Sequence, residues 1–178
     1  TINLGLFYGM GKAKLQAELG VSKDKADELF TIYHERVPFV KSLMNSVSNR
    51  AQQRGQIRTL LGRLCRFHLW EPNQFGIHKA LPFDQARQEY GAGIKRAYTY
   101  KALNKLIQGS AADMTKKSML ELYKEGIVAH IQVHDELDIS VEDDIKAKRI
   151  KEIMESAVEL EIPNKVDYEF GKNWGDIK

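Results

Sequence analysis

The spacing of apolar residues changes from helical to strictly alternating after residue 128, and this change constrains the fold more than any other feature of the sequence. Apolar and polar residues alternate in 129–133 and again in 137–141, which places the apolar side chains of each run on one face of a strand. Only "HDE" separates the two runs. The sequence therefore predicts an antiparallel hairpin of two half-buried strands, with a histidine and two acids at its tip.

The first third of the chain carries helix signals. Ser22 is a predicted N-cap for a helix that Pro38 closes, and a second helix with an apolar stripe follows as far as Gly55. Residues 56–67 are rich in strand formers and arginine, which indicates a basic hairpin. Residues 70–82 contain two prolines and a glycine and are predicted to be a loop.

Helical composition returns from Asp84 to about Ile107, and a further helix is predicted after "QGS", ending at Gly126. Beyond the hairpin, Asp143 or Asp144 starts another helix, and "KVDYEF" is predicted to be a last strand. We therefore expect an α+β fold, in which helices come first and later helices pack on a small antiparallel sheet. A chain of 178 residues is long enough for one domain or two subdomains.

Composition excludes several classes. Cys65 is the only cysteine, which argues against a disulfide framework or a cysteine zinc site and favours a reducing, intracellular setting. No apolar run approaches the ~20 residues of a membrane span, so we expect no membrane association. The net charge of +3 allows a nucleic-acid partner without requiring one.

The acids at the predicted hairpin tip are candidate metal ligands. Asp135 and Glu136 are adjacent, and at a tight turn both side chains can reach the same space. Carboxylate oxygens suit Mg²⁺, which is commonly held by one or two carboxylates together with substrate phosphates and water. The alternative is that these acids only solvate a turn.

Three polar residues spaced by four, Tyr100, Asn104 and Gln108, would form one stripe on a helix. Amide side chains in such a row can donate to adenine N3 and thymine O2 in the minor groove, which A·T and T·A pairs present alike. A solvated helix face is the alternative.

Two further segments could contact nucleic acid. In "GLFYGMGKAK", the glycines allow close backbone approach and Tyr8 offers a ring for stacking. Five arginines between residues 50 and 66, among them Arg63, could follow phosphates, or could pair with acids of the preceding helices.

Four motifs, taken in order, resemble the family A DNA polymerases, the DNA polymerase I group. "TINLGLFYGMG" is similar to the second half of the fingers motif, "LNKLIQGSAAD" to the primer-template helix, "VHDE" to the second catalytic motif and "FGKNWGD" to the C-terminal "GxxW" strand. The resemblance implies that residues 1–94 are the C-terminal part of the fingers and residues 95–178 the C-terminal part of the palm.

The same resemblance implies roles for the hairpin residues. Asp135 would be a ligand of the two catalytic Mg²⁺ ions, Glu136 an assisting carboxylate, and His134 a neighbour of the primer 3′ end. The reaction would be two-metal phosphoryl transfer.

The resemblance also implies contacts with primer-template DNA and deoxynucleoside triphosphates (dNTPs). Tyr8 would stack where the templating base enters, and Asn104 and Gln108 would contact the minor groove and template. The implied nucleotide- and template-binding residues are Leu4, Tyr8 and Gly9, and the implied DNA-binding residues are Tyr100, Asn104, Gln108 and Arg63.

Two positions depart from the family pattern. Leu4 stands where the family usually has phenylalanine or tyrosine beside the incoming sugar, so we expect altered handling of sugar-modified nucleotides. Tyr100 stands where arginine is frequent, which leaves one phosphate or groove contact open.

The first catalytic aspartate and the triphosphate-binding arginine and lysine of the family lie upstream of the fingers motif, before Thr1. We therefore expect this chain alone to be inactive, and to work with an N-terminal polymerase fragment in the cytoplasm of a bacterium or a phage-infected cell. A split gene, an intein or processing would each produce such a piece. The alternatives are a non-catalytic DNA-binding module and a Mg²⁺-dependent nuclease using Asp135 and Glu136, which would need further acids nearby.

Overall fold

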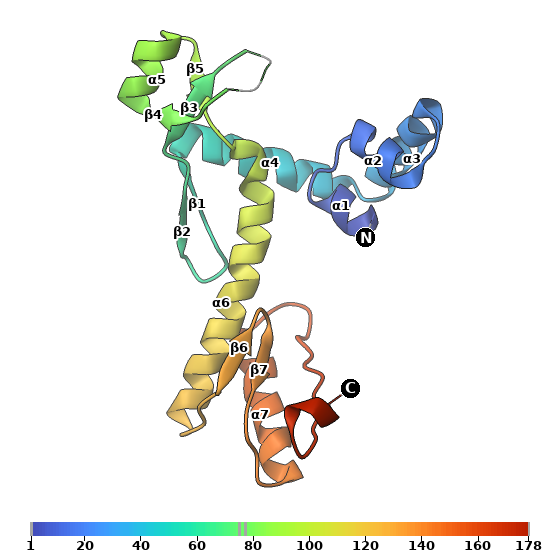
Figure 1. The fold of residues 1–178 in the computed structure, drawn as a ribbon, viewed down its shortest axis with the longest axis vertical. Coiled ribbons are helices and arrows are strands. Elements are labelled where there is room, and N and C mark those ends of the chain that lie inside the picture. Colours follow the sequence, from blue (N-terminus) through green and yellow to red (C-terminus); the bar gives the residue numbers. More distant parts are fainter. Residues whose placement is uncertain (1, 75, 77, 178) are drawn as a thin grey trace. The chain divides into compact units, whose positions relative to one another are not determined.

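The structure is a computed structural model that describes residues 2–74, 76 and 78–177. The chain divides into two compact units, Thr1–Gly109 and Ser110–Lys178. Figure 1 shows the elements of both units along the chain. The fold class of the chain is α+β, as predicted, with helices and small antiparallel sheets.

The first unit begins with helices whose ends follow the sequence signals. Their bounds are α1 Ile2–Phe7, α2 Lys12–Leu19, α3 Lys23–Arg36 and α4 Pro38–Arg54. The predicted cap is confirmed, because Ser22 Oγ accepts a hydrogen bond from the Lys25 N–H at 3.3 Å. Pro38 occupies the first turn of α4, where its missing N–H costs nothing. Gly55 ends α4 with φ 67°, as predicted.

The basic hairpin is also confirmed. Strand β1 (Gln56–Arg58) pairs antiparallel with β2 (Leu64–Arg66). Behind the hairpin, the core joins the end of α4 to the start of a later helix through buried Val47, Ala51, Ile57, Phe67 and Ala102.

The prediction for residues 70–107 is wrong in two places. The loop predicted at 70–82 contains β3 (Leu69–Pro72) and β4 (Leu81–Pro82), which form the sheet β4-β3-β5 with β5 (Ile94–Arg96). Phe75 and Ile77 of this segment lie outside the described residues. The stretch from Asp84 is not continuously helical, because α5 (Phe83–Tyr90) ends at Gly91, where φ is 75°.

Residues 102–124 form a single helix, and the predicted break at "QGS" is wrong. After a short 3₁₀ turn, η1 (Thr99–Lys101), helix α6 runs from Ala102 to Lys124 and contains Gly109 in its interior. Glycine in a helix costs up to ~1 kcal/mol relative to alanine, which the remaining hydrogen bonds of a long helix outweigh. Ser118 and Leu122 are buried on this helix, whereas Ala111 is exposed.

The second unit contains the predicted acidic hairpin, β6 (Ile131–Val133) and β7 (Glu136–Asp138), and helix α7 (Asp144–Ser156). Asp143 caps α7 by accepting from the Lys146 N–H at 2.8 Å. The core of the second unit contains buried Leu122, Ile150 and Ile153.

Residues 165–170 form no strand, so the prediction for "KVDYEF" is wrong. Alternating side chains alone do not make a strand, since a strand also needs a neighbour to pair with, and no sheet of the described residues includes this segment. A short 3₁₀ turn, η2 (Trp174–Asp176), follows.

The register of the acidic hairpin corrects one further expectation. Ile131 lies opposite Asp138 and Val133 opposite Glu136, so these four side chains share a face. Leu137 points the other way, into the core of the unit. Strand β6 is therefore exposed rather than half-buried, with Ile131 and Val133 exposing 43% and 41% of their area. Within the described residues, none of the helices is long and apolar enough to span a membrane.

Candidate functional site

The predicted site residues fall into two groups, one in each unit. The first group to consider is the turn of the β6–β7 hairpin. Because Val133 pairs with Glu136, only His134 and Asp135 form the loop. His134 has φ 52°, a left-handed conformation that is uncommon outside glycine and in which histidine is enriched. The Gln132 side chain donates to the His134 carbonyl oxygen and so braces the turn.

The turn presents its polar side chains to solvent. His134, Asp135 and Glu136 are all exposed. Asp135 lies within the loop and Glu136 begins β7, so two carboxylates stand next to each other on a paired strand end. A two-stranded ladder fixes this backbone more tightly than an open loop would.

Asp138, the second acid of β7, shares the face of Glu136 but is only partly exposed. Its Oδ2 atom is buried and has no hydrogen-bond partner among the described residues. Ile131 lies directly opposite Asp138 on the same face of the hairpin.

The donor set at the turn fits magnesium in part. Asp135 and Glu136 supply hard oxygen donors, and Mg²⁺ usually takes one or two protein carboxylates while keeping several water ligands. The described part of the chain holds no group of three or more histidine, cysteine or acidic side chains that could bind a metal ion. These two residues can therefore hold part of a magnesium site, with further ligands coming from water, substrate or another carboxylate.

The second group lies on the first half of α6. Asn104 and Gln108 are exposed on one side of α6, and Tyr100, which is 68% exposed, lies in the 3₁₀ turn η1 just before the helix. Leu103 is 1% exposed on the opposite side, packed into the unit. The polar stripe is thus open to a partner along its whole length.

Two segments distant in sequence meet α6 at the end of this stripe. Gln108 Nε2 donates to the Tyr8 hydroxyl at 2.8 Å, across 100 residues of sequence. Arg63 of the basic hairpin donates from Nη2 to the Gly109 carbonyl oxygen at 2.7 Å. Tyr8, Gln108 and Arg63, predicted from three separate motifs, are therefore gathered at one place.

Gly109 makes the approach of the basic hairpin possible. A Cβ atom at this position would lie 2.8 Å from Cγ2 of Thr59, closer than real side chains come. Thr59 is buried, and its Oγ1 accepts from the Arg63 N–H at 3.0 Å. The glycine of "QGS" is thus explained by close packing within a helix, not by a helix end.

Leu4 and Gly9 lie on either side of the end of α1. Leu4 is 59% exposed. Gly9 has φ 86°, and a Cβ there would come 3.1 Å from the Met44 sulfur of α4, so glycine suits both the backbone and the packing.

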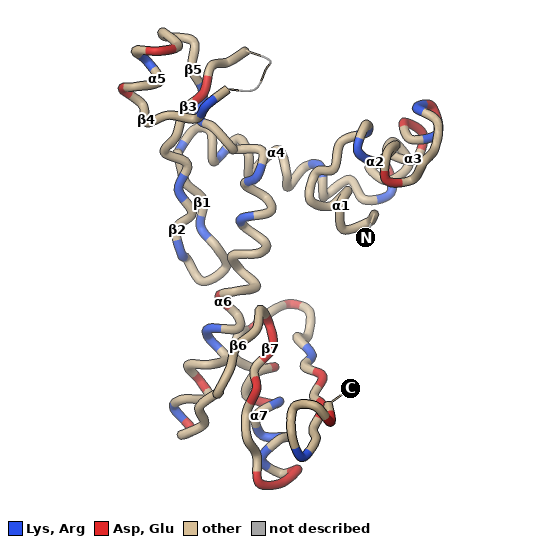
Figure 2. The backbone as a smooth tube through the Cα atoms, in the orientation of Figure 1, with Lys and Arg blue, Asp and Glu red and all other residues tan. Residues whose placement is uncertain are grey.

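Two basic residues near this stripe, Lys101 of η1 and Lys105 of α6, were not predicted from the sequence. Lys101 lies with its ammonium 5.6 Å from the Tyr100 ring centre, and Lys105 lies 5.1 Å from that of Phe67. Their spacing of four residues was the available signal. Figure 2 shows basic residues along β1, β2 and the start of α6.

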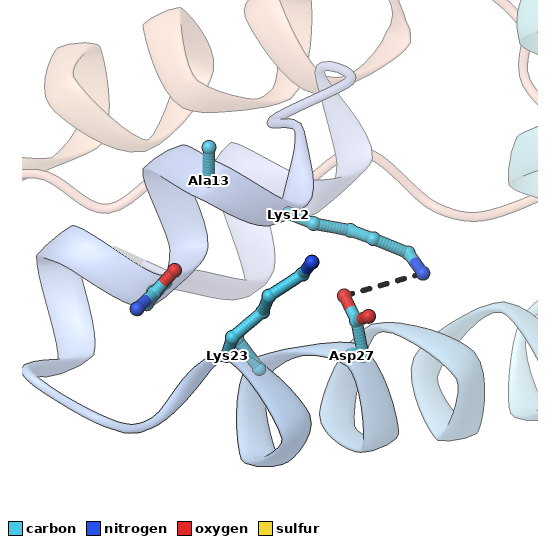
Figure 3. A pocket seen from close by; sticks show the side chains of 6 residues that line it. Lys12, Ala13, Lys23 and Asp27 are labelled. Carbon is cyan, nitrogen blue, oxygen red and sulfur yellow. Dashed lines mark ion pairs between the residues drawn. The ribbon is translucent and has the colours of Figure 1, made fainter.

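A shallow pocket between α2 and α3 involves none of the predicted site residues. Figure 3 shows Lys12, Ala13, Lys23 and Asp27 lining it, with an ion pair of 3.2 Å between Lys12 Nζ and Asp27 Oδ1. The charged groups of this pocket are on surface side chains of α2 and α3, so the pocket is separate from the stripe on α6.

Comparison with known proteins gives a consistent result. The family described as DNA polymerase family A matches residues 1–176. The chain is 32% identical to a DNA-directed DNA polymerase of Pseudomonas phage M6 over 208 residues, covering 98% of this chain and 28% of the relative. It is 33% identical to DNA polymerase I of Bacillus caldotenax over 187 residues, covering 100% of this chain and 19% of the relative.

A solved structure agrees with these relatives. The POL domain of Pol1 from M. smegmatis, in complex with DNA primer-template and dNTP, aligns with a TM-score of 0.67 and 28% identity. The alignment covers 90% of this chain and 27% of that one. The chain thus spans less than a third of the length of each of these proteins.

Proposed function

The chain belongs to DNA polymerase family A, and we propose that it carries part of the active site of a DNA-directed DNA polymerase. The proposed reaction is template-directed transfer of a deoxynucleotide to a primer 3′ end. The observation that carries the proposal is the β6–β7 turn, where Asp135 and Glu136 are consecutive and both exposed in the "VHDE" motif. The match along residues 1–176 and the DNA complex of the structural relative support it.

At this turn the chain's own residues would bind the metal ions and border the primer end. Asp135 is the proposed metal ligand, Glu136 assists it, and His134 lies beside the primer 3′ end. Two magnesium ions would supply activation of the 3′-hydroxyl and neutralisation of the charge on the leaving pyrophosphate. The fixed backbone of the hairpin holds both carboxylates ready before substrate arrives.

The α6 stripe is the proposed DNA contact. Asn104 and Gln108 would face the minor groove, whose acceptors are shared by A·T and T·A pairs and so suit an enzyme that copies any sequence. Tyr100 and Arg63 would contact the same duplex, and Lys101 and Lys105 add positive charge near it. At the end of α1, Tyr8 would stack on the template and Leu4 and Gly9 would border the nucleotide.

We further propose that the site is completed outside residues 1–178. Asp135 and Glu136 provide one side of a two-metal clamp, and an N-terminal polymerase fragment would supply the other carboxylate. Residues 1–94 would then belong to the fingers and 95–178 to the palm. Since the relatives named above come from a phage and a bacterium, we place this activity in the cytoplasm of a bacterium or a phage-infected cell.

The test is Mg²⁺-dependent primer extension by this chain alone and by its mixture with the upstream polymerase fragment from the same source. The proposal expects extension in the mixture only. Extension by this chain alone would contradict the shared site. DNA binding without extension in the mixture would favour a non-catalytic DNA-binding module, and degradation of the DNA would favour a nuclease.

A further inference from the structure

We propose that the Tyr8 hydroxyl is a positioning group, which fixes the orientation of the Gln108 carboxamide toward the DNA minor groove. This inference rests on the proposed function and adds a role for the hydroxyl beyond stacking of the Tyr8 ring. It starts from the 2.8 Å hydrogen bond in which Gln108 Nε2 donates to the Tyr8 hydroxyl.

The hydroxyl is held in place by the end of α1. The Tyr8 N–H donates to the Leu4 carbonyl oxygen at 3.0 Å, and the Gly9 N–H to that of Leu6 at 3.0 Å. The ring of Phe7 meets the ring of Tyr8 edge-on, with centres 5.5 Å apart. Tyr8 itself is only partly exposed. The acceptor therefore comes from a braced backbone, not from a free side chain.

The backbone beneath the amide is braced as well. Gln108 lies within α6, and Arg63 donates to the carbonyl oxygen of the next residue, Gly109, at 2.7 Å. With both the helix and the hydroxyl held, rotation of the terminal amide of Gln108 decides which of its atoms faces Tyr8. That torsion is broad and roughly two-fold, so it is the one that a hydrogen bond must settle.

In the structure the amide nitrogen, not the amide oxygen, faces Tyr8, which is the orientation that the minor groove requires. A carboxamide has two N–H donors and one carbonyl acceptor. Adenine N3 and thymine O2 are acceptors and need a donor. When one N–H is bound to Tyr8, the other remains on the same nitrogen for the base, and the carbonyl oxygen points away from Tyr8. Without the hydroxyl, the amide can turn and direct its oxygen at the base, where acceptor faces acceptor.

The experiment measures primer extension by the mixture of this chain with its upstream fragment. One primer ends in deoxyadenosine and a second in 3-deaza-deoxyadenosine, which lacks the N3 acceptor but pairs normally. The variants are Tyr8→Phe, which keeps the ring, Gln108→Met, and the double substitution. Tyr90→Phe is the matched control, because it also removes a hydrogen-bonded tyrosine hydroxyl, which donates from Oη to the Lys79 carbonyl oxygen at 3.1 Å.

We expect the unaltered protein to extend the natural primer about 3- to 10-fold faster than the 3-deaza primer, the value of one hydrogen bond. Tyr8→Phe should bring this ratio close to one, and Tyr90→Phe should leave it unchanged. In the Gln108→Met background, Tyr8→Phe should cause no further change in the ratio.

Three results would overturn the inference. Equal slowing of both primers by Tyr8→Phe would mean a general structural role for the hydroxyl. A ratio that still changes in the Gln108→Met background would mean that the hydroxyl acts without Gln108. A ratio near one in the unaltered protein would mean that a contact to adenine N3 in the minor groove does not contribute to the rate. Failure of the unaltered mixture to extend the natural primer would instead refute the proposed function, on which the inference rests.

Discussion

At the scale of single residues, the packing of His34 makes the free energy of unfolding depend on pH. It lies partly buried on α3, with its ring 4.4 Å from that of Phe30 and its Nδ1 buried without a partner among the described residues. Burial, and secondly the charge of Lys41, lower the pKa of His34 below its ordinary value of 6.5. The folded state therefore binds a proton at this site less readily than the unfolded chain does.

The sign of the expected effect follows from this difference. Above pH 6.5 both states are neutral at His34, and as the pH falls toward the lower folded-state pKa, the unfolded chain gains the proton first and stability is lost. We expect the free energy of unfolding, measured in urea, to fall between pH 7.5 and pH 5, and to fall less in His34→Gln. The exposed residue His68 provides the control, and an equal flattening in His68→Gln would contradict the assignment.

Leu4 gives a second expectation at this scale. It is 59% exposed at α1, in the position where the family usually has an aromatic residue beside the incoming sugar. A phenol at this position adds a hydroxyl that can interact with the sugar-phosphate region of a nucleotide lacking its 3′-hydroxyl. We expect Leu4→Tyr to raise the use of dideoxynucleotides relative to deoxynucleotides by about tenfold, equivalent to ~1.4 kcal/mol. Competitive extension assays measure this ratio, and an unchanged ratio would contradict the proposal that Leu4 lies at the nucleotide site.

At the scale of elements, the contact between the basic hairpin and α6 depends on Gly109. In Gly109→Ala, the added Cβ would meet the Thr59 methyl at 2.8 Å. Overpacking of this kind costs about 1–3 kcal/mol, against which the better helix propensity of alanine returns at most ~1 kcal/mol. We expect a net loss of stability of about 1 kcal/mol and weaker DNA binding, because the hairpin that carries Arg63 must move.

A compensating substitution makes this expectation specific. Thr59→Ser removes the clashing methyl but keeps the hydroxyl that accepts from the Arg63 N–H. Introduced into Gly109→Ala, it should restore both urea stability and DNA affinity. Gly11→Ala, where nothing lies within 4 Å of the added atom, serves as the control. No restoration by Thr59→Ser would mean that Gly109 matters for another reason.

Elements with local signals were predictable from the sequence, and elements that depend on distant partners were not. A few adjacent residues determine each of three features: the cap at Ser22, the helix end at Gly55 and the turn of the acidic hairpin. Strands β3, β4 and β5 have no such signal, because they form by pairing with segments that are not adjacent to them in sequence. Likewise, the glycine at position 109 predicts a helix end from the sequence alone, because its packing against Thr59, 50 residues away, has no local signal.

At the scale of the whole molecule, the same distinction applies to the site. The β6–β7 turn could be found from the sequence, since its three polar residues are contiguous. The hydrogen bond between Tyr8 and Gln108 could not, since 100 residues separate the partners and only the folded first unit joins them. The proposed metal ligands lie in the second unit, and the proposed DNA-contacting stripe lies in the first.

The most direct test of the account is the single-turnover extension rate of the mixture with Asp135→Asn, compared with Asp144→Asn. Both substitutions remove one exposed carboxylate from the second unit, but Asp144 lies in the first turn of α7. We expect Asp135→Asn to lower the rate by about a thousandfold or more, the loss of several kcal/mol of metal stabilisation, while primer-template affinity stays within about twofold. Asp144→Asn should keep the rate. Equal rates for the two variants would contradict the assignment of the β6–β7 turn as the catalytic metal site.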